Sequence, residues 1–460
     1  MSIKDRIIRM GQGYLHEEKL YGKQFIDTYE FLQTSQWWTK EQHEEYQIQK
    51  IKKVLTEAYS NVPYYTKLFN EYDINVSKIQ DFSDIKKIPY LTKEIIMDNI
   101  DLLYNKNFPK YRIEYKTTGG STGIPMGLYQ DRFETRMREK AFVTHMWNRV
   151  GYDIRVKQKI VYLRGINIKG KFEYNGKNLI LNSFLLNENN FLEYLNMIEQ
   201  FNPDFINGYP SVIYLLAKYM IDNNIRRRIK NTKAILLTSE NVFDFQRKII
   251  EEAFGVRVYS FYGHTERACI AGECEESAYY HIHSEYGYTE LINSSGNEST
   301  KENELSEIVC TGFINPVMPF IRYKTKDIAI NTLKKCNCGR NYKLIKKIEG
   351  RTQDFILDEF NNIITFTCND EPLWGIKDKI NSYQYIQAEK GKILLNINPK
   401  NHINTDEINR VKYEFESIFK NINLQIKIVD NIDREKNGKF KYLIQNLNIS
   451  SISSISDSKN

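Results

Sequence analysis

Between residues 159 and 263 the chain alternates short apolar β-rich runs with helical patterns, and this alternation limits the possible folds more than any other feature. The runs are KIVYLRG, DFING, AILLTSE and VRVYSFYG, and the clearest helical patterns are PSVIYLLAKYMIDNN and FDFQRKIIEEAFG. Strands that helices cover on both faces are typically continuous apolar runs. The pattern therefore predicts an α/β fold with mostly buried strands. Upstream, Asp131 is a candidate N-cap of the helical pattern RFETRMREKAFVTHMWNRV.

Regions of different character flank this α/β part. Residues 1–100 read as a helical lead-in, and after about residue 350 the strands KILLNIN and LQIKIVD and the helix NTDEINRVKYEFESIFKN indicate a small α+β unit. A chain of 460 residues is too long for one compact core. We expect a large domain over 1–350, a small domain over 351–445 and a serine-rich disordered tail over 446–460.

The stretch TTGGSTGIP, residues 117–125, places hydroxyl side chains and glycines between two strand patterns, RIEYKTT and MGLYQ. Backbone N–H groups and hydroxyls that converge on one point form an anion site, and glycine lets the backbone come close. The expected ligand is a polyphosphate. The stretch is not a Walker A motif, because Ile124 follows Gly123 where that motif has lysine.

The same stretch resembles the phosphate-binding loop of the adenylate-forming superfamily, which includes acyl-CoA synthetases, adenylation domains and luciferases. Further segments resemble that superfamily's signatures in its order: FYGHTE at 261–266, IRYKTKDIA at 321–329, EGRTQDFI at 349–356 and KNGKFKYLI at 436–444. LTEAYSNVPYYTKLF, NGYPS, LTSE and CNCGR make the chain most similar to the phenylacetate–CoA ligase family, including its capsular-polysaccharide biosynthesis branch. The implied fold is a large N-terminal domain of mixed sheets flanked by helices, with a small mobile α+β C-terminal domain.

The resemblance implies a reaction in which ATP and a small carboxylic acid form an acyl-adenylate, and it assigns residues to the nucleotide. The phosphates would lie on Thr117, Thr118, Gly119, Gly120, Ser121, Thr122 and Gly123. Tyr262 would stack on adenine beside Gly263, Ser239 and Glu240, while Asp327 and Arg351 would bind the ribose hydroxyls. Thr265 would contact the α-phosphate and Glu266 would ligate Mg²⁺.

Lys439 is implied as the catalytic lysine that bridges the substrate carboxylate and the α-phosphate, and Lys436 and Lys441 are neighbours that could be confused with it. The chain departs from the superfamily at two positions. Lys326 stands where glycine often precedes the ribose aspartate. Gln353 stands where Asp or Lys is common at the hinge, so that Gln353 and Asp354 are both candidate pivots.

The acyl pocket and the acceptor are less defined. Tyr209, Pro210 and His264 are candidate wall residues, because they follow strands whose carboxyl ends should meet at one edge of the sheet. CoA is the expected acceptor and co-substrate. The alternatives are an amine on a sugar or amino acid in surface-polysaccharide biosynthesis, or a non-catalytic nucleotide-binding relative.

The cysteines form a second cluster of candidate ligands. Cys336 and Cys338 make a C-x-C motif, and with Cys274 and His281 they would supply three thiolates and one imidazole, as a closed structural zinc site requires. His283 is the alternative to His281, and free thiols are the alternative to zinc. The other cysteines are expected to be buried apolar residues: Cys269, Cys310 and Cys368.

Charge and targeting patterns point to a cytoplasmic protein that acts on small molecules. The formal net charge is only +7 and the lysines are interspersed with acids, which argues against a nucleic-acid partner. The N-terminus has no apolar core of a signal peptide, and no stretch approaches the ~20 apolar residues of a membrane span.

Overall fold

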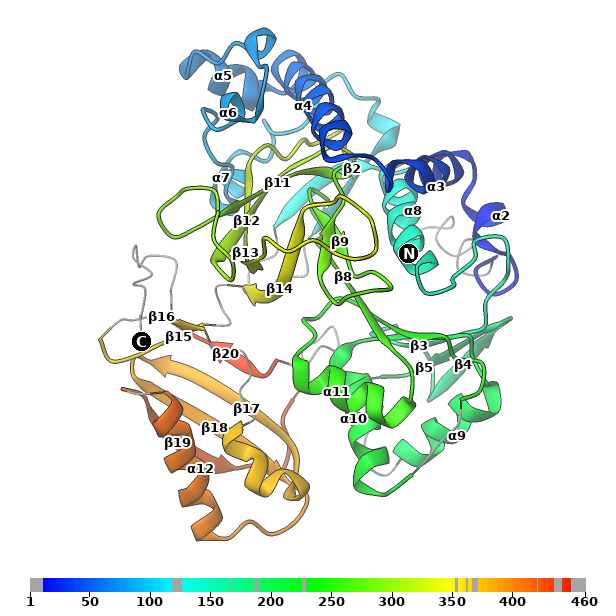
Figure 1. Cartoon of the computed structure of the whole chain (residues 1–460), viewed down its shortest axis with the longest axis vertical. Helices are drawn as coiled ribbons and strands as arrows, with labels where there is room; N and C mark the ends of the chain where they lie inside the picture. Colours follow the sequence, from blue (N-terminus) through cyan, green and yellow to red (C-terminus); the bar gives the residue numbers. More distant parts are fainter. Residues whose placement is uncertain are drawn as a thin grey trace.

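The computed structural model describes residues 11–117, 126–166, 168–183, 185–186, 190–225, 229–351, 355–360, 363–365, 371–419, 421–433 and 441–447. Figure 1 shows a large upper part, which contains both helices and sheets, above a smaller C-terminal sheet. No helix among the described residues has the length and apolarity that a membrane crossing requires.

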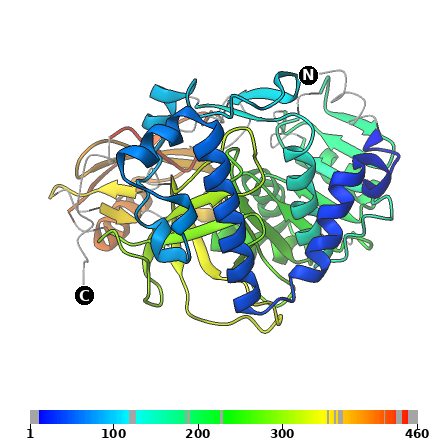
Figure 2. The same ribbon diagram turned by 90° about the horizontal axis from the view of Figure 1, so that it is seen from above.

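The N-terminal region is helical, as expected. Its helices are α2 (Glu17–Tyr21), α3 (Lys23–Ser35), α4 (Lys40–Asn61), α5 (Pro63–Glu71), α6 (Phe82–Ile85) and α7 (Lys93–Asn99). Helix α4 begins with a capping box, in which the Thr39 hydroxyl accepts from Gln42 N and the Gln42 amide oxygen accepts from Thr39 N. Figure 2 shows α3 and α4 lying across one end of the molecule.

Strands β1 (Ile113–Thr117) and β2 (Gly127–Asp131) pair antiparallel on either side of the glycine- and hydroxyl-rich stretch. That stretch, from residue 118 to 125, lies outside the described residues. Helix α8 (Thr135–Asn148) follows, but Asp131 is not its N-cap, since Glu134 holds that position. Asp131 instead ends β2, where it pairs with Arg112 and accepts a hydrogen bond from Phe133 N at 2.9 Å.

A 12-stranded mixed sheet forms the body of the protein, with strand order β11-β12-β13-β14-β10-β9-β8-β7-β6-β3-β5-β4. The half that comes first in the sequence contains β3 (Ile160–Leu163), β4 (Phe172–Asn175), β5 (Asn178–Leu181), β6 (Phe205–Gly208), β7 (Ala234–Leu237) and β8 (Val258–Gly263). In that half β5, β3, β6, β7 and β8 are parallel to one another, and β4 pairs antiparallel at the edge.

The second half of the sheet is antiparallel and begins where β9 pairs with β8. Its strands are β9 (Ile270–Gly272), β10 (Tyr280–Ile282), β11 (Gly287–Ile292), β12 (Leu305–Gly312), β13 (Tyr323–Asn331) and β14 (Leu344–Arg351). Arg322, just before β13, is buried and binds both carboxylate oxygens of Glu290 and the carbonyls of Lys86 and Ile88. The helical lead-in is thereby joined to this half of the sheet.

Helices cover both faces of the parallel strands. Helices α9 (Phe191–Phe201), α10 (Pro210–Asp222) and α11 (Asp244–Phe254) bury one face through a core that includes Val161, Ile206 and Ile235. On the other face Trp147 of α8 and Tyr152 pack against alternate strand residues such as Phe205 and Leu236. Strands β5, β6 and β7 are buried at every position, as their continuous apolar sequences predict.

The C-terminal part has a four-stranded sheet of its own with the order β19-β18-β17-β20. Its elements are β15 (Phe355–Leu357), β16 (Ile363–Thr365), β17 (Ile380–Glu389), β18 (Lys392–Pro399), α12 (Thr405–Ile418), β19 (Asn423–Ile428) and β20 (Leu443–Gln445). Phe415 of α12 and Leu395 of β18 belong to a separate hydrophobic core. The predicted α/β class, with a small α+β C-terminal part, is confirmed.

Candidate functional site

The carboxyl ends of β6, β7 and β8 lie side by side, and many of the predicted nucleotide- and acid-binding residues follow directly after them. Tyr209 and Pro210 follow β6 and begin α10, while Ser239 and Glu240 follow β7. Tyr262 and Gly263 end β8. In open α/β sheets ligands bind at this edge of the strands, so that the fold gathers residues the sequence scatters.

Tyr262 and Asp327 meet at the junction between the two halves of the sheet. The Tyr262 hydroxyl donates a hydrogen bond of 2.7 Å to Asp327 Oδ2. Burial and the charge of Asp327 raise the pKa of Tyr262, so the hydroxyl stays a donor. Asp327 of β13 is the register partner of Arg351 of β14, which places the backbones of the two predicted ribose-binding residues opposite each other.

Glu266 lies in the loop after β8, is buried, and has its carboxylate held on two sides. His264 Nδ1 donates to Oε2 at 3.1 Å and the Tyr323 hydroxyl donates to Oε1 at 2.9 Å. Burial opposes the charged form, but the attraction of His264 and these hydrogen bonds outweigh it and lower the pKa of Glu266 to about 2. The carboxylate is thus ionised at neutral pH, as a Mg²⁺ ligand must be.

Glu240 binds the first turn of helix α10. Its carboxylate accepts hydrogen bonds from Ser211 N at 3.0 Å and Ser211 Oγ at 3.1 Å, at the N-terminus of α10. The preceding Ser239 has φ 68, a left-handed conformation that is uncommon for non-glycine residues. The turn after β7 is therefore shaped around α10 by Glu240.

His264 contacts Glu266, whereas Thr265 is exposed beside it. Tyr209 is half-buried, and its N–H bonds to Leu163 O at 3.0 Å, which joins the start of α10 to β3. Thr117 ends β1 and is exposed. The rest of the predicted phosphate loop (118–123), both candidate pivots (353 and 354) and the lysine at 439 lie outside the described residues.

Sequence reasoning missed two residues that shape this site. Tyr323 binds Glu266, and Ser211 binds Glu240. Tyr323 is the tyrosine of the segment IRYKTKDIA, so its place in that motif was a usable signal. Ser211 is likewise the serine of the segment NGYPS, and Glu240 ends LTSE, so both motifs were visible in the sequence. Their pairing across 29 residues was not.

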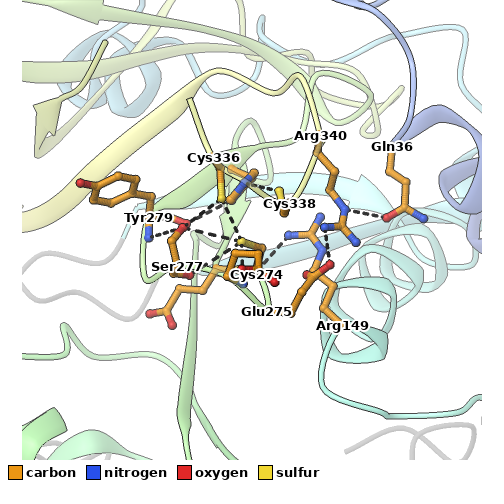
Figure 3. Close-up of polar contacts among 12 residues, drawn as sticks. Gln36, Arg149, Cys274, Glu275, Ser277, Tyr279, Cys336, Cys338 and Arg340 are labelled. Atoms are coloured by element: carbon orange, nitrogen blue, oxygen red, sulfur yellow. Dashed lines mark hydrogen bonds and ion pairs between the residues drawn. The ribbon is translucent and has the colours of Figure 1, made fainter. Parts of the chain in front are cut away.

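A second cluster joins Cys274, His281, Cys336 and Cys338, whose ligand atoms all lie within 4.8 Å of one another. Cys274 follows β9, His281 lies in β10, and the C-x-C motif lies in the loop between β13 and β14. Cys274 Sγ and Cys336 Sγ are 3.4 Å apart, and Cys338 Sγ is 3.2 Å from His281 Nε2. Figure 3 shows the cysteines converging.

The surroundings of this cluster favour a metal. His281 Nδ1 donates to the Tyr279 carbonyl at 3.1 Å, which leaves Nε2 free to face the thiols. Its neighbour His283 is instead directed to Arg149, with 3.3 Å between Nε2 and Nη2. A hydrogen bond with Cys274 lowers the pKa of Cys338 to about 7, against the effect of burial. One of the thiols is therefore readily ionised.

Arg340 ties the cluster to the helical lead-in. It donates to Gln36 Oε1 at 2.8 Å and to Glu275 Oε1 at 2.8 Å, and Figure 3 shows it beside Cys338. Cys269 and Cys310 are buried, as predicted, and residue 368 lies outside the described part.

Comparisons with known proteins show which proteins the chain resembles. Residues 356–446 match the model of the CapK C-terminal domain. The chain is 26% identical over 415 residues to Protein CapK of Staphylococcus aureus, covering 88% of this chain and 89% of that protein. It is 22% identical over 363 residues to the phenylacetate–coenzyme A ligase of Thermus thermophilus, covering 75% and 78%. A crystal structure of 2-hydroxyisobutyryl-CoA ligase with an acyl-AMP has a TM-score of 0.70, with 15% identity and coverage of 89% and 90%.

Proposed function

Because the chain is a homologue of CapK and of the phenylacetate–CoA ligases and has the fold of adenylate-forming CoA ligases, we propose that it is an ATP- and Mg²⁺-dependent ligase that activates a carboxylic acid. Its products would be an acyl-adenylate and pyrophosphate, followed by transfer of the acyl group to an acceptor. The observation that carries this proposal is the meeting of Tyr262 and Asp327 beside the ionised Glu266.

The residues would act mainly by positioning and by electrostatics. Asp327 accepts from the ribose hydroxyls while Tyr262 holds its carboxylate in place and presents a ring to adenine. Glu266 would hold Mg²⁺, which neutralises phosphate charge. Lys439 would approach from the C-terminal part and offset the repulsion between the acid and the α-phosphate. Ser239, Glu240 and Gly263 would border the base, and Thr265 would contact the α-phosphate.

CoA is the proposed acceptor, since several relatives are named as CoA ligases. An amine acceptor is the second candidate, because the chain also resembles Protein CapK, which is not named as a CoA ligase. The acid would enter near Tyr209, Pro210 and His264, at the carboxyl ends of β6 and β8.

We propose two moving parts, one up to residue 350 and one from residue 351 to 445, with a pivot at 351–354. Separate hydrophobic cores in the two parts support this division. We propose that the cysteine–histidine cluster binds a structural Zn²⁺, because three thiols and an imidazole leave no open position for a substrate. Thiols that must stay reduced favour a cytoplasmic location.

The direct test is ATP–pyrophosphate exchange with a panel of aryl, short-chain and hydroxy acids. Exchange that depends on one acid and on Mg²⁺ supports the proposal. The acceptor is then identified by adding CoA or amines to the preformed adenylate and following thioester or amide by mass spectrometry. A protein that binds ATP but shows no exchange with any acid is a nucleotide-binding relative and not a ligase.

A further inference from the structure

Tyr442, which directly precedes β20, is one of the residues through which the C-terminal sheet contacts the large part. Its carbonyl accepts from Tyr385 N at 2.8 Å, and its ring lies 5.4 Å from the ring of Tyr383. Tyr442 is therefore fixed to the C-terminal sheet by both its backbone and its side chain. In Figure 1 this side of the sheet faces α10 and α11.

At the boundary between the two parts, which we call the seam, the Tyr442 ring packs against the start of α11. Phe243 and Phe245 meet it edge-on, with ring centroids 5.8 and 6.1 Å away and interplanar angles of 88° and 90°. Gln246 Nε2 donates to the Tyr442 hydroxyl at 3.2 Å. Gln246 is itself held, since it is only 1% exposed and its Oε1 accepts from Phe243 N at 3.1 Å.

Beside this contact the boundary between the two parts is hollow. A cavity of about 370 Å³ lies between α10 and the C-terminal sheet, and Tyr442 is among its lining residues. At the cavity Lys400 and Asp222 form an ion pair between the two parts, with 3.7 Å between Nζ and Oδ2. A solvated ion pair of that length contributes little binding energy. The packing of Tyr442 against Phe243 and Phe245 is therefore the more specific of the two contacts.

We propose that Tyr442 is a positioning residue, which fixes the C-terminal part against α11 in the arrangement that forms the adenylate. It stands three residues after Lys439 in the sequence KFKY, so holding Tyr442 limits how far the attachment point of Lys439 can move. This inference rests on the proposed function. It assigns to Tyr442 a role in the first half-reaction, which is formation of the adenylate, and none in the second, which is transfer of the acyl group to the acceptor.

The test separates the two half-reactions in single-turnover experiments. Tyr442→Ala and Phe243→Ala are expected to slow adenylate formation by roughly 10–100-fold, because a misplaced catalytic group costs about that much. We call the contact of Tyr442 with Phe243 and Gln246 the clamp. The rate of acyl transfer from preformed adenylate should stay within about twofold of wild type, because the clamp acts before that step. Tyr442→Phe keeps the ring and should retain most of the rate. The matched control is Tyr413→Ala, at a tyrosine of α12 that is 74% exposed, and it should change neither step.

Hydrogen exchange provides a readout that does not depend on activity. Phe243→Ala, on the large part, should speed the exchange of residues 441–446 across the seam, while the core of the C-terminal sheet at Leu395 stays protected. Unchanged exchange at 441–446 overturns the clamp even if the enzyme is active. Equal slowing of both half-reactions also overturns it. If no acid supports adenylation by the wild type, the proposed function fails, but the exchange result still decides whether Tyr442 is a clamp.

Discussion

Tyr262 and Asp327 are 65 residues apart in the chain, yet the tyrosine hydroxyl donates to the aspartate carboxylate at 2.7 Å. This bond joins the last parallel strand of the sheet, β8, to β13 in the antiparallel half. It orients the one carboxylate that the proposed function assigns to the ribose.

Tyr262→Phe should therefore raise the KM for ATP roughly tenfold, because a hydrogen bond to a charged group is lost while the ring is kept. The kcat should change little, and steady-state kinetics at saturating acid measure both. Tyr259→Phe is the matched control, since the buried Tyr259 hydroxyl has no hydrogen-bond partner among the described residues. An equal effect of both variants on KM contradicts the assignment of Asp327.

Lys439→Ala should lower the rate of ATP–pyrophosphate exchange by ~10²–10³-fold, the usual cost of losing a group that stabilises developing charge. ATP binding, measured by calorimetry, should be nearly unchanged. Lys436→Ala and Lys441→Ala are the neighbouring controls. If one of them causes the large loss instead, the catalytic role belongs to that lysine.

Purified protein should contain about one Zn²⁺ per chain by mass spectrometry of the metal, as a closed four-ligand site predicts. Cys274→Ser and His281→Gln should both remove it and lower the Tm, because metal binding and folding are coupled. His283→Gln is the control that should keep the metal, since His283 faces Arg149. Loss of zinc only in His283→Gln would show that the alternative histidine is the ligand.

The stability of the protein should depend on the ionisation of Glu266 in a defined pH range. Its pKa is lowered from 4.5 to about 2 in the folded state, so its contribution is complete above the unfolded pKa and is lost as pH falls through the folded pKa. In Mg²⁺-free buffer, the difference in unfolding free energy between wild type and Glu266→Gln should have its full value near pH 5. Below pH 4.5 it should shrink.

A second variant tests the cause of that shift. Tyr323→Phe removes one of the donors that lower the pKa of Glu266, so the pH range in which stability is lost should move upward. Urea unfolding at a series of pH values measures both effects. A difference that keeps growing as pH falls has the wrong sign and contradicts the ionised carboxylate.

Lys326 stands where the related motif often has glycine, and its φ of 64 explains why glycine is favoured there. A left-handed conformation costs a non-glycine residue ~1–2 kcal/mol. Lys326→Gly should therefore be more stable than Lys326→Ala by ~1 kcal/mol in urea unfolding, although both lose the 2.7 Å ion pair with Glu94. At Lys324, two residues earlier in β13, the order should reverse, because φ there is not positive.

Local patterns in the sequence predicted the elements well. The strands β3, β6, β7 and β8 and the C-terminal strands β18 and β19 follow from the apolar runs of the sequence. Asp131 was predicted wrongly as a helix cap, because its partner Arg112 lies in another segment and competes for its carboxylate. The residues next to Asp131 in the sequence favour a helix cap, but they do not reveal that Arg112 will bind its carboxylate.

The site was predictable only as far as its motifs extend. Choosing between His281 and His283 required the path of the loop that carries Cys336 and Cys338, which no local pattern gives. The pairing of Tyr323 with Glu266 depends likewise on how β8 and β13 are placed in the sheet. Contacts between distant segments are decided by packing of the whole sheet.

The carboxylate of Glu240 occupies the first turn of α10, so the positive end of that helix dipole is already neutralised by the protein itself. A triphosphate arriving at this edge of the sheet meets an N-terminus of α10 that is already occupied, unlike in folds that bind phosphate through such a terminus. In the proposed function the negative charge is then balanced by the glycine- and hydroxyl-rich stretch and by two partners that come and go, namely a divalent ion and a lysine from the other part of the chain. An enzyme built this way would bind its nucleotide loosely until those partners arrive, which favours release of the spent nucleotide after each turnover.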